Sequence, residues 1–153
     1  MVFISSRSGW YGDAFVSAYS GSKFALEGLV EGFRWETEHL GIKTILIEPG
    51  RFRTKLLSSG NLKVVPSKVA DYAEASKGFI EQLAQEDQNQ PGDAEKAVGV
   101  IVDLVRKEGC AESGDIPFRL PLGTDCFETI KEKCEETLKL LEKWERVIKS
   151  TDY

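Results

Sequence analysis

The sequence predicts an α/β fold in which about three parallel strands form a sheet covered by helices. Short apolar runs alternate with longer segments of helical periodicity along a chain of 153 residues. The runs are almost continuously apolar, which is typical of parallel strands buried on both faces. Apolar residues make up 41% of the sequence, so a chain of this length can bury a core of its own.

Four elements are predicted in the first third of the chain. Val2–Ser5 is an apolar, β-branched run that predicts a buried strand, and the Gly-containing segment 6–17 predicts a loop. A helix is expected over 18–40, ended by Gly41. Its apolar stripe follows helical spacing at Leu26, Leu29, Val30 and Phe33. A second strand is expected over 43–48, ended by Pro49-Gly50.

The remaining elements are mostly helical. Ser67 is the expected N-cap of a helix that runs to Glu86, and Asp93 is the expected N-cap of a helix over 94–107. Pro117 and Pro121 mark 118–122 as a short strand at the edge of the sheet. A long helix follows over 124–150, with an a/d seam at Phe127, Ile130, Cys134, Thr137, Leu141, Trp144 and Ile148.

Composition excludes several functional classes. The formal net charge is −5, which disfavours nucleic-acid binding through a basic surface. No apolar stretch is long enough to span a bilayer, and the first residues lack the basic region and cleavage site of a signal peptide. Three cysteines without CxxC spacing and a single histidine predict no metal site and no disulfide framework. We therefore expect a cytoplasmic protein with reduced thiols and no membrane or nucleic-acid partner.

Tyr19 and Lys23 carry the first chemical signal. They stand four positions apart on the first predicted helix, so both side chains emerge on one face. A phenol is a poor acid or base at neutral pH, and a nearby ammonium group favours the phenolate. Such a pair can therefore act as a general acid/base. The hydroxyl groups of Ser5, Ser6 and Ser8, just after the first strand, are candidates to bind the same reacting oxygen.

Three segments in order resemble the short-chain dehydrogenase/reductase family. YSGSKFALEGL is similar to that family's active-site helix, and ISSRSGWYG is similar to the strand and loop that carry its serine. IEPGRFRT is similar to its P-G-x-x-x-T segment. The family's spacing selects Ser6, which stands 13 positions before Tyr19. PFRLPLGTD and the preceding helices resemble the tail of some members, so the resemblance extends over nearly the whole chain.

The resemblance implies an oxidoreductase that interconverts a carbonyl and a secondary alcohol with NAD or NADP. Tyr19 would be the general acid/base, Ser6 would bind the reacting oxygen, and Lys23 would bind the nicotinamide ribose. The implied cofactor-binding residues are Tyr19, Lys23, Pro49, Gly50, Phe52 and Thr54. The implied substrate-binding residues are Ser6, Arg7, Trp10, Tyr11 and Tyr19, with 55–68 as a substrate lid. The partner would be a small carbonyl or alcohol molecule.

The family's Gly-rich nucleotide-binding turn has no counterpart within these residues. That turn places a pyrophosphate on a helix N-terminus. We therefore expect residues 1–153 to form the C-terminal, catalytic portion of a doubly wound, Rossmann-like domain, ending in the helix 124–150. A partial sheet would leave the strand 2–5 at an edge. The chain alone is expected to bind NAD(P) weakly and to turn over little.

Two alternatives follow from the same residues. A truncated family member could act without catalysis, through binding or through a homo-oligomer formed by the 18–40 helix or the exposed strand edge. The genomic sequence upstream of Met1 separates this alternative from a shortened enzyme, because a Gly-rich turn there would complete the nucleotide site. An unrelated α/β domain with chance motifs would leave Ser6, Tyr19 and Lys23 apart in space.

Overall fold

Three parallel strands form the centre of the molecule. The structure, a computed structural model, describes residues 1–58, 60–65 and 67–153. The strands are β1 (Val2–Ile4), β2 (Ile45–Pro49) and β3 (Arg119–Leu122), in the order β1-β2-β3. Phe3 pairs with Leu46, and Ile47 pairs with Leu120. The predicted α/β class with a parallel, Rossmann-like sheet is confirmed.

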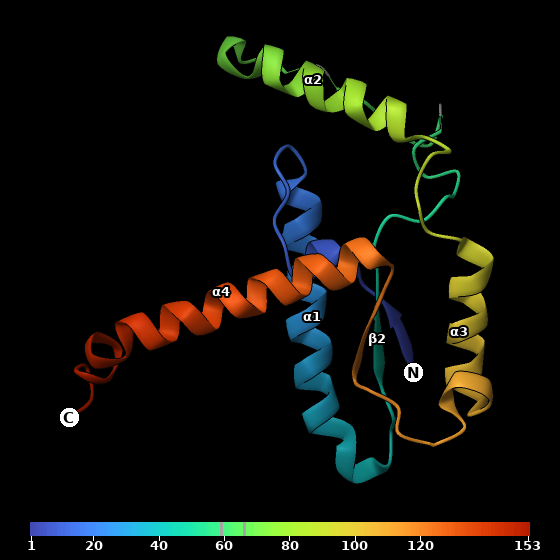
Figure 1. Ribbon diagram of the computed structural model, residues 1–153, viewed down its shortest axis with the longest axis vertical. Helices are drawn as coiled ribbons and strands as arrows, with labels where there is room; N and C mark the ends of the chain where they lie inside the picture. The colour runs from blue at the N-terminus through green and yellow to red at the C-terminus, as the bar shows by residue number, and fades with distance from the viewer. Residues whose placement is uncertain (59, 66) are drawn as a thin grey trace.

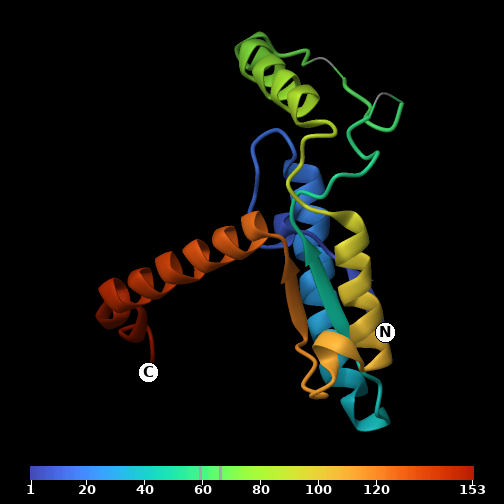
Figure 2. The same cartoon turned by 45° about the vertical axis from the view of Figure 1, so that its right-hand side comes forward.

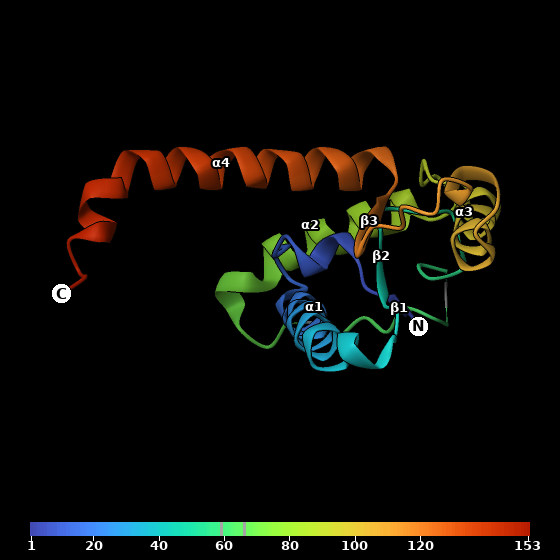
Figure 3. The ribbon, with the colours of Figure 1, turned by 90° about the horizontal axis from the view of Figure 1, so that it is seen from below.

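Two helices cover the sheet and two extend from it. The main helices are α1 (Ser17–Thr37), α2 (Ala70–Glu86), α3 (Ala94–Arg106) and α4 (Thr124–Lys149). Helices α1 and α3 lie on opposite faces of the sheet (Figure 3). Helix α2 lies beyond the ends of the strands, and α4 projects away from the sheet (Figures 1 and 2). Single-turn 3₁₀ helices follow β1 (Arg7–Gly9, η1), end α1 (Glu38–Leu40, η2) and follow α3 (Gly109–Ala111, η3).

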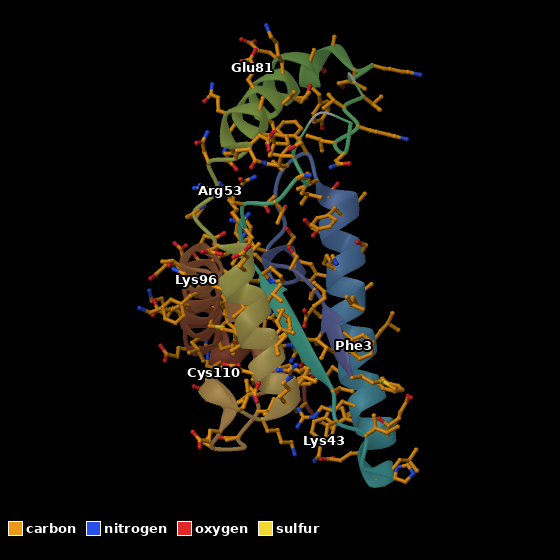
Figure 4. The ribbon with its side chains drawn as sticks, turned by 90° about the vertical axis from the view of Figure 1, so that its right-hand side faces the viewer. Phe3, Lys43, Arg53, Glu81, Lys96 and Cys110 are labelled. Carbon is orange, nitrogen blue, oxygen red and sulfur yellow. The ribbon has the colours of Figure 1, made fainter. Side chains whose placement is uncertain are left out.

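The core lies between β2 and α3. Ile45 and Ile47 are buried against Leu104 and Ala111. Partly buried apolar residues complete this cluster, namely Val100, Ile101, Ile116, Leu120 and Leu122. On the other face Phe3 of β1 meets α1 (Figure 4), and its ring centroid is 6.4 Å from that of Phe33. Ile45, Leu46 and Ile47 of β2 are all buried, so both faces of this strand are covered, which explains its apolar sequence.

Most helix boundaries agree with the sequence prediction. Gly41 has the left-handed conformation (φ 72°) expected of a helix C-terminus. Asp93 caps α3 by accepting hydrogen bonds from the backbone N–H groups of Glu95 and Lys96 at 3.0 and 3.2 Å. Ser67, in contrast, is not the N-cap of α2. That helix begins at Ala70, and the Ser67 hydroxyl instead accepts from the N–H of Val69 in a turn just before it.

The prediction that β1 is buried is wrong. Val2 and Ile4 are 38% and 50% exposed because β1 is the edge of the sheet and lacks a neighbour on its outer side. Residues 1–153 thus leave β1 at the edge, as a partial sheet predicts. The predicted edge position of the strand at 118–122 is also confirmed.

The predicted apolar stripe of α1 is only partly the face that packs. Val30 is buried, but Leu29 is 72% exposed, while Ser20 and Glu27 are buried. Polar interactions account for this orientation, since Glu27 pairs with Arg119 of β3 and Lys23 bonds to the carbonyl of Ile4. The seam predicted for the last helix is likewise largely exposed, including Phe127, Leu141, Trp144 and Ile148.

No helix within the described residues is long and apolar enough to cross a membrane. All three cysteines are free, with Cys126 buried and Cys110 and Cys134 exposed. Among the described residues no group of histidine, cysteine or acidic side chains could hold a metal ion.

Candidate active site

Lys23 lies at the carboxyl end of β1, where the carboxyl ends of the parallel strands meet. Its Nζ donates a hydrogen bond of 3.0 Å to the carbonyl of Ile4. The same Nζ lies 5.7 Å from the centroid of the Tyr19 ring. Lys23 therefore links the predicted acid/base residue on α1 to the strand that leads into Ser6. Ligands of open α/β sheets bind at this edge.

Ser6 begins the turn that follows β1. Its backbone is extended (φ −169°), and its Oγ accepts a hydrogen bond of 3.1 Å from the N–H of Ser8. Ser6 thereby caps η1 and is held in one position. Ser5 and Ser8 are both buried. Their burial leaves Ser6, of the three candidate hydroxyls, as the half-buried one at this edge.

Tyr19 lies in the first turn of α1 and is 47% exposed. Its backbone carbonyl accepts a hydrogen bond of 2.7 Å from the Ser22 hydroxyl. The structure thus brings Tyr19 and Lys23 together directly. Ser6 follows the same strand end, two positions after Ile4, whose carbonyl Lys23 contacts.

The end of β2 and the loop after it hold the predicted cofactor-binding residues Pro49, Gly50, Phe52 and Thr54. The N–H of Gly50 donates to the carbonyl of Leu122 at 2.8 Å, which continues the β2–β3 pairing into the loop. Thr54 is exposed, and its Oγ1 accepts from the N–H of Leu56 at 3.3 Å. The predicted lid over 55–68 includes residues 59 and 66, which lie outside the described residues.

Two contacts not predicted from the sequence fix this loop. Asp125, at the start of α4, accepts a hydrogen bond of 2.9 Å from the N–H of Arg51. Gly92 forms an isolated parallel bridge with Phe52, with backbone hydrogen bonds to Arg51 and Arg53 of 3.0 and 2.8 Å. A side chain at position 92 would lie 2.6 Å from the Phe52 ring, so the bridge requires glycine.

The predicted substrate-binding residues occupy different environments. Arg7 forms an ion pair of 2.7 Å with Asp13 in the loop before α1. Tyr11 is 48% exposed and lines a groove with Thr129 and Lys133 of α4. Trp10 instead turns its indole N–H toward the sheet and donates a hydrogen bond of 2.9 Å to Glu48.

A buried group of charged residues lies behind the loop 6–13. Glu48 on β2 is 1% exposed, and Arg119 on β3 lies between its carboxyl group (3.7 Å) and that of Glu27 on α1 (2.9 Å). Burial raises the pKa of Glu48 to about 7, against the opposing effect of the Trp10 hydrogen bond. The hydrogen bond from Arg119 lowers the pKa of Glu31, which lies at the surface end of this group.

Four residues of this region, namely Glu48, Arg119, Asp125 and Gly92, were not predicted from the sequence. One signal was available, since Glu48 is a charged residue inside an otherwise apolar predicted strand, and a buried carboxyl group needs a partner. The other three residues act across long sequence separations. Nothing local marks Arg119 as a partner of Glu27, 92 positions away.

Comparisons with known proteins agree with the motif resemblance. The family described as short chain dehydrogenase matches residues 1–64. An uncharacterized oxidoreductase of Bacillus subtilis, YusZ, is 34% identical over 110 residues, which are 71% of this chain and 39% of that protein. The 3-ketodihydrosphingosine reductase of Bacteroides thetaiotaomicron is 28% identical over 123 residues, or 80% of this chain and 43% of that protein.

A solved structure matches almost all of the fold. A short-chain dehydrogenase from Streptomyces avermitilis is 37% identical, with a TM-score of 0.79, over 99% of this chain and 52% of that one. The chain thus spans about half the length, or less, of these relatives. The sequence match, the matching architecture and the ordered motifs all point to one family. This chain belongs to the short-chain dehydrogenase/reductase family.

Proposed function

We propose that this chain supplies the catalytic residues of an NAD(P)-dependent oxidoreductase that interconverts a carbonyl and a secondary alcohol. The observation that carries the proposal is the position of Lys23. Its ammonium group contacts the carbonyl of Ile4 at 3.0 Å and lies 5.7 Å from the Tyr19 ring. A general acid/base and the cation that assists it therefore lie together where a parallel sheet binds ligands.

Each residue has a defined role in this reaction. The Tyr19 hydroxyl donates a proton to the carbonyl oxygen in reduction and removes it from the alcohol in oxidation. Ser6 donates a hydrogen bond to the same oxygen, where negative charge develops during reduction. Lys23 supplies a positive charge 5.7 Å from the centroid of the Tyr19 ring. A location in the cytoplasm, with its reduced thiols, is part of the proposal.

The residues present fit one end of a dinucleotide cofactor. Lys23 supplies a cation, and the loop 49–54 supplies backbone groups fixed by Asp125 and Gly92. These residues would hold the nicotinamide ribose and carboxamide, and the nicotinamide supplies or accepts the hydride when bound. The diphosphate end lacks a match, since residues 1–153 contain no Gly-rich turn between a strand and a helix. Saturable NADH or NADPH binding at submillimolar concentration by the 153-residue chain would contradict this assignment.

A chimera tests the reaction itself. The 153-residue chain is joined to the part of the Streptomyces dehydrogenase that it does not match, and oxidation of NADH and NADPH is followed with ketone substrates. We expect turnover in the chimera and little in the chain alone. Tyr19→Phe should lower kcat by at least ~100-fold, because it removes the transferred proton but keeps the ring. Ser6→Ala should lower kcat by about 100-fold, because it removes one donor to the developing oxyanion.

The matched control is Tyr72→Phe, an exposed tyrosine on α2 that lies outside the site. It should leave turnover unchanged. A chimera whose turnover is equal with tyrosine or phenylalanine at position 19 would exclude Tyr19 as the acid/base. The second candidate function, binding or oligomerisation without catalysis, rests on the exposed edge of β1. It predicts a folded chimera with no turnover on any ketone or alcohol tested.

A further inference from the structure

Glu48 is a buried carboxyl group that the proposed reaction does not use. It lies on the central strand β2, directly before the Pro49-Gly50 loop, and is 1% exposed. Its backbone carbonyl accepts a hydrogen bond of 3.1 Å from the thiol of Cys126, which ties the strand end to α4. A buried carboxyl group is costly unless its oxygens have partners, so its contacts indicate why it is there.

Glu48 connects the sheet to α1 through Arg119. The Nε of Arg119 lies 3.7 Å from the Glu48 carboxyl and donates a hydrogen bond of 2.9 Å to Glu27. Its Nη2 donates a hydrogen bond of 2.6 Å to Glu31, one turn further along α1. Arg119 therefore fixes the carboxyl groups from β2 and α1 against each other in a geometry that only a guanidinium group provides.

Glu48 also holds the loop that carries Ser6. Its Oε1 accepts a hydrogen bond of 2.9 Å from the indole N–H of Trp10. The backbone N–H of Trp10 donates to Arg7, and that of Gly9 donates to Ser6, at 3.0 and 2.8 Å. Because Trp10 is bonded to this turn, fixing its side chain also fixes the turn that begins at Ser6.

The turn is packed closely enough for this constraint to act. A Cβ atom at Gly9 would lie 2.8 Å from the Ser5 hydroxyl and 3.0 Å from Glu27, so the turn rests directly on the acidic group. Lys133 of α4 donates a hydrogen bond to the backbone carbonyl of Trp10 from the other side. Trp10 is thus held at its indole by the sheet and at its backbone by α4.

We propose that Glu48 is a positioning residue, whose carboxyl group holds the Trp10 indole and, through it, the turn that presents Ser6. The catalytic role of that turn rests on the proposed function, but the contact between Glu48 and Trp10 does not. Trp10, which the family resemblance placed in the substrate pocket, thereby supports the turn instead. Its indole N–H is engaged with the protein interior.

The charges around Glu48 indicate that the contact responds to pH. The carboxyl groups of Glu27, Glu31 and Glu48 face one guanidinium group, that of Arg119. The thiol of Cys126 lies against the Glu48 backbone, and burial raises its pKa to about 12, so it stays neutral. The cations on the loop side are already paired, Arg7 with Asp13 and Lys133 with the Trp10 carbonyl.

The pairing with Arg119 lowers the pKa of Glu31, so the proton that this group retains near neutral pH is expected on Glu48. Burial favours Glu48 as its site and raises the pKa of Glu48 to about 7. Loss of that proton converts the acceptor of the Trp10 hydrogen bond from a neutral to a charged group, which strengthens the bond. The environment of Trp10 should therefore change as pH rises through this range.

Trp10 fluorescence tests the proposal without any need for turnover. The emission of the W10F variant is subtracted from that of the wild type at each pH, which removes the contributions of the exposed Trp35 and Trp144. We expect the Trp10 emission maximum to shift with a midpoint near pH 7. Glu48→Gln keeps a hydrogen-bond acceptor without charge, so it should retain the low-pH emission of Trp10 and lose the titration. Glu48→Leu should change the emission at every pH.

The control variant is Glu31→Gln, which removes a carboxyl group from the same Arg119 without touching Trp10. It should leave a titration of Trp10 in place. The proposal is overturned if Glu48→Gln titrates like the wild type, or if folded Glu48→Leu keeps the wild-type emission. Should Glu48→Leu fail to fold, the comparison of the wild type with Glu48→Gln still decides.

The activity of the chimera tests whether the contact between Glu48 and Trp10 matters for catalysis. Glu48→Leu should lower kcat more than it raises KM, and Glu48→Gln should restore most of the loss, because it restores the acceptor. A Trp10 titration that depends on Glu48 in a chimera without turnover would support the contact and refute the oxidoreductase function. Turnover that is unaffected by Glu48→Leu, with an unchanged Trp10 signal, would refute the contact and leave the function standing.

Discussion

The carboxyl group of Glu48 links the stability of the fold to pH in the range up to about 7. Its pKa is about 7 in the folded chain, whereas the ordinary value is 4.5. Between these values the folded state holds a proton that the unfolded state has lost, so stability falls as pH rises and changes no further above about 7. The loss is at most on the order of 3 kcal/mol, because one pH unit between the two pKa values corresponds to roughly 1.4 kcal/mol. Glu48→Gln should remove it.

Urea unfolding at about pH 5 and about pH 8 measures this difference in the wild type and in Glu48→Gln. Glu31→Gln is the control, because the pKa of Glu31 is lowered and its stabilising pairing is lost only at more acidic pH. It should keep the wild-type difference between the two conditions. Parallel behaviour of Glu48→Gln and the wild type would show that Glu48 does not titrate in this range.

The three thiols should differ sharply in reactivity. Burial raises the pKa of Cys126 to about 12, and its Sγ donates to the Glu48 carbonyl at 3.1 Å. Cys110 and Cys134 are exposed. A thiol-specific disulfide reagent should therefore modify two cysteines quickly in the native chain and the third only in denaturant. The Cys126→Ala variant checks the assignment, because it should keep two fast thiols and lose the slow one. Three fast thiols in the wild type would contradict the buried position of Cys126.

The sequence predicts how side chains are arranged where that arrangement follows from their local spacing. The separation of Tyr19 and Lys23 places both on one face of α1, and the structure has the Lys23 ammonium beside the Tyr19 ring. The group formed by Glu27, Glu48 and Arg119 could not be predicted, because it depends on where β3 lies relative to α1. That position is set by packing of the whole sheet, not by any short segment.

The segment before α3 should be destabilised by a single added methyl group at position 92. Gly92→Ala introduces a Cβ 2.6 Å from Phe52 and 2.7 Å from the Arg51 carbonyl, so the bridge to the loop after β2 must open. We expect a loss of roughly 1–3 kcal/mol in stability, as in other overpacked sites. Chemical denaturation measures it, and faster proteolysis within 49–58 would show that the loop has been released.

Gly99 provides a matched substitution on the adjacent helix. It lies inside α3, and a Cβ there meets nothing within 4 Å. Gly99→Ala should stabilise the chain by about 0.8–1 kcal/mol, since alanine is the better helix former. Equal effects of the two substitutions, in either direction, would mean that the Phe52–Gly92 bridge does not constrain the loop.

Helix faces were harder to predict than helix ends. Asp93 and Gly41 mark boundaries through local hydrogen bonding and backbone conformation, and both predictions were confirmed. The prediction of which face of α1 packs against the sheet was partly wrong, because apolar periodicity takes no account of a buried salt bridge. Glu27 turns inward toward Arg119, and Leu29 is left 72% exposed. A polar partner on another element can thus determine which face a helix buries, where the pattern of apolar residues alone does not.

For the whole molecule, the exposed edge of β1 predicts self-association. Val2 and Ile4 are 38% and 50% exposed on a strand that pairs on one side only, and such an edge can pair with another chain. Light scattering after gel filtration of the 153-residue chain should show a mass that rises with concentration. Val2→Lys should reduce this rise, because a charged side chain at an edge disfavours strand pairing.

The surface of helix α1 is the alternative site for this self-association. Lysine substitutions on β1 and on α1 distinguish the two sites. Leu29→Lys alters α1 at a residue that is 72% exposed, and Leu56→Lys alters an equally accessible apolar residue away from both surfaces. If the edge governs assembly, only Val2→Lys lowers the mass at high concentration, because a new charge elsewhere leaves the backbone groups of β1 free to pair. A larger effect of Leu29→Lys would assign the interface to α1. A monomer at all concentrations that unfolds cooperatively would show that the exposed edge of β1 does not drive self-association.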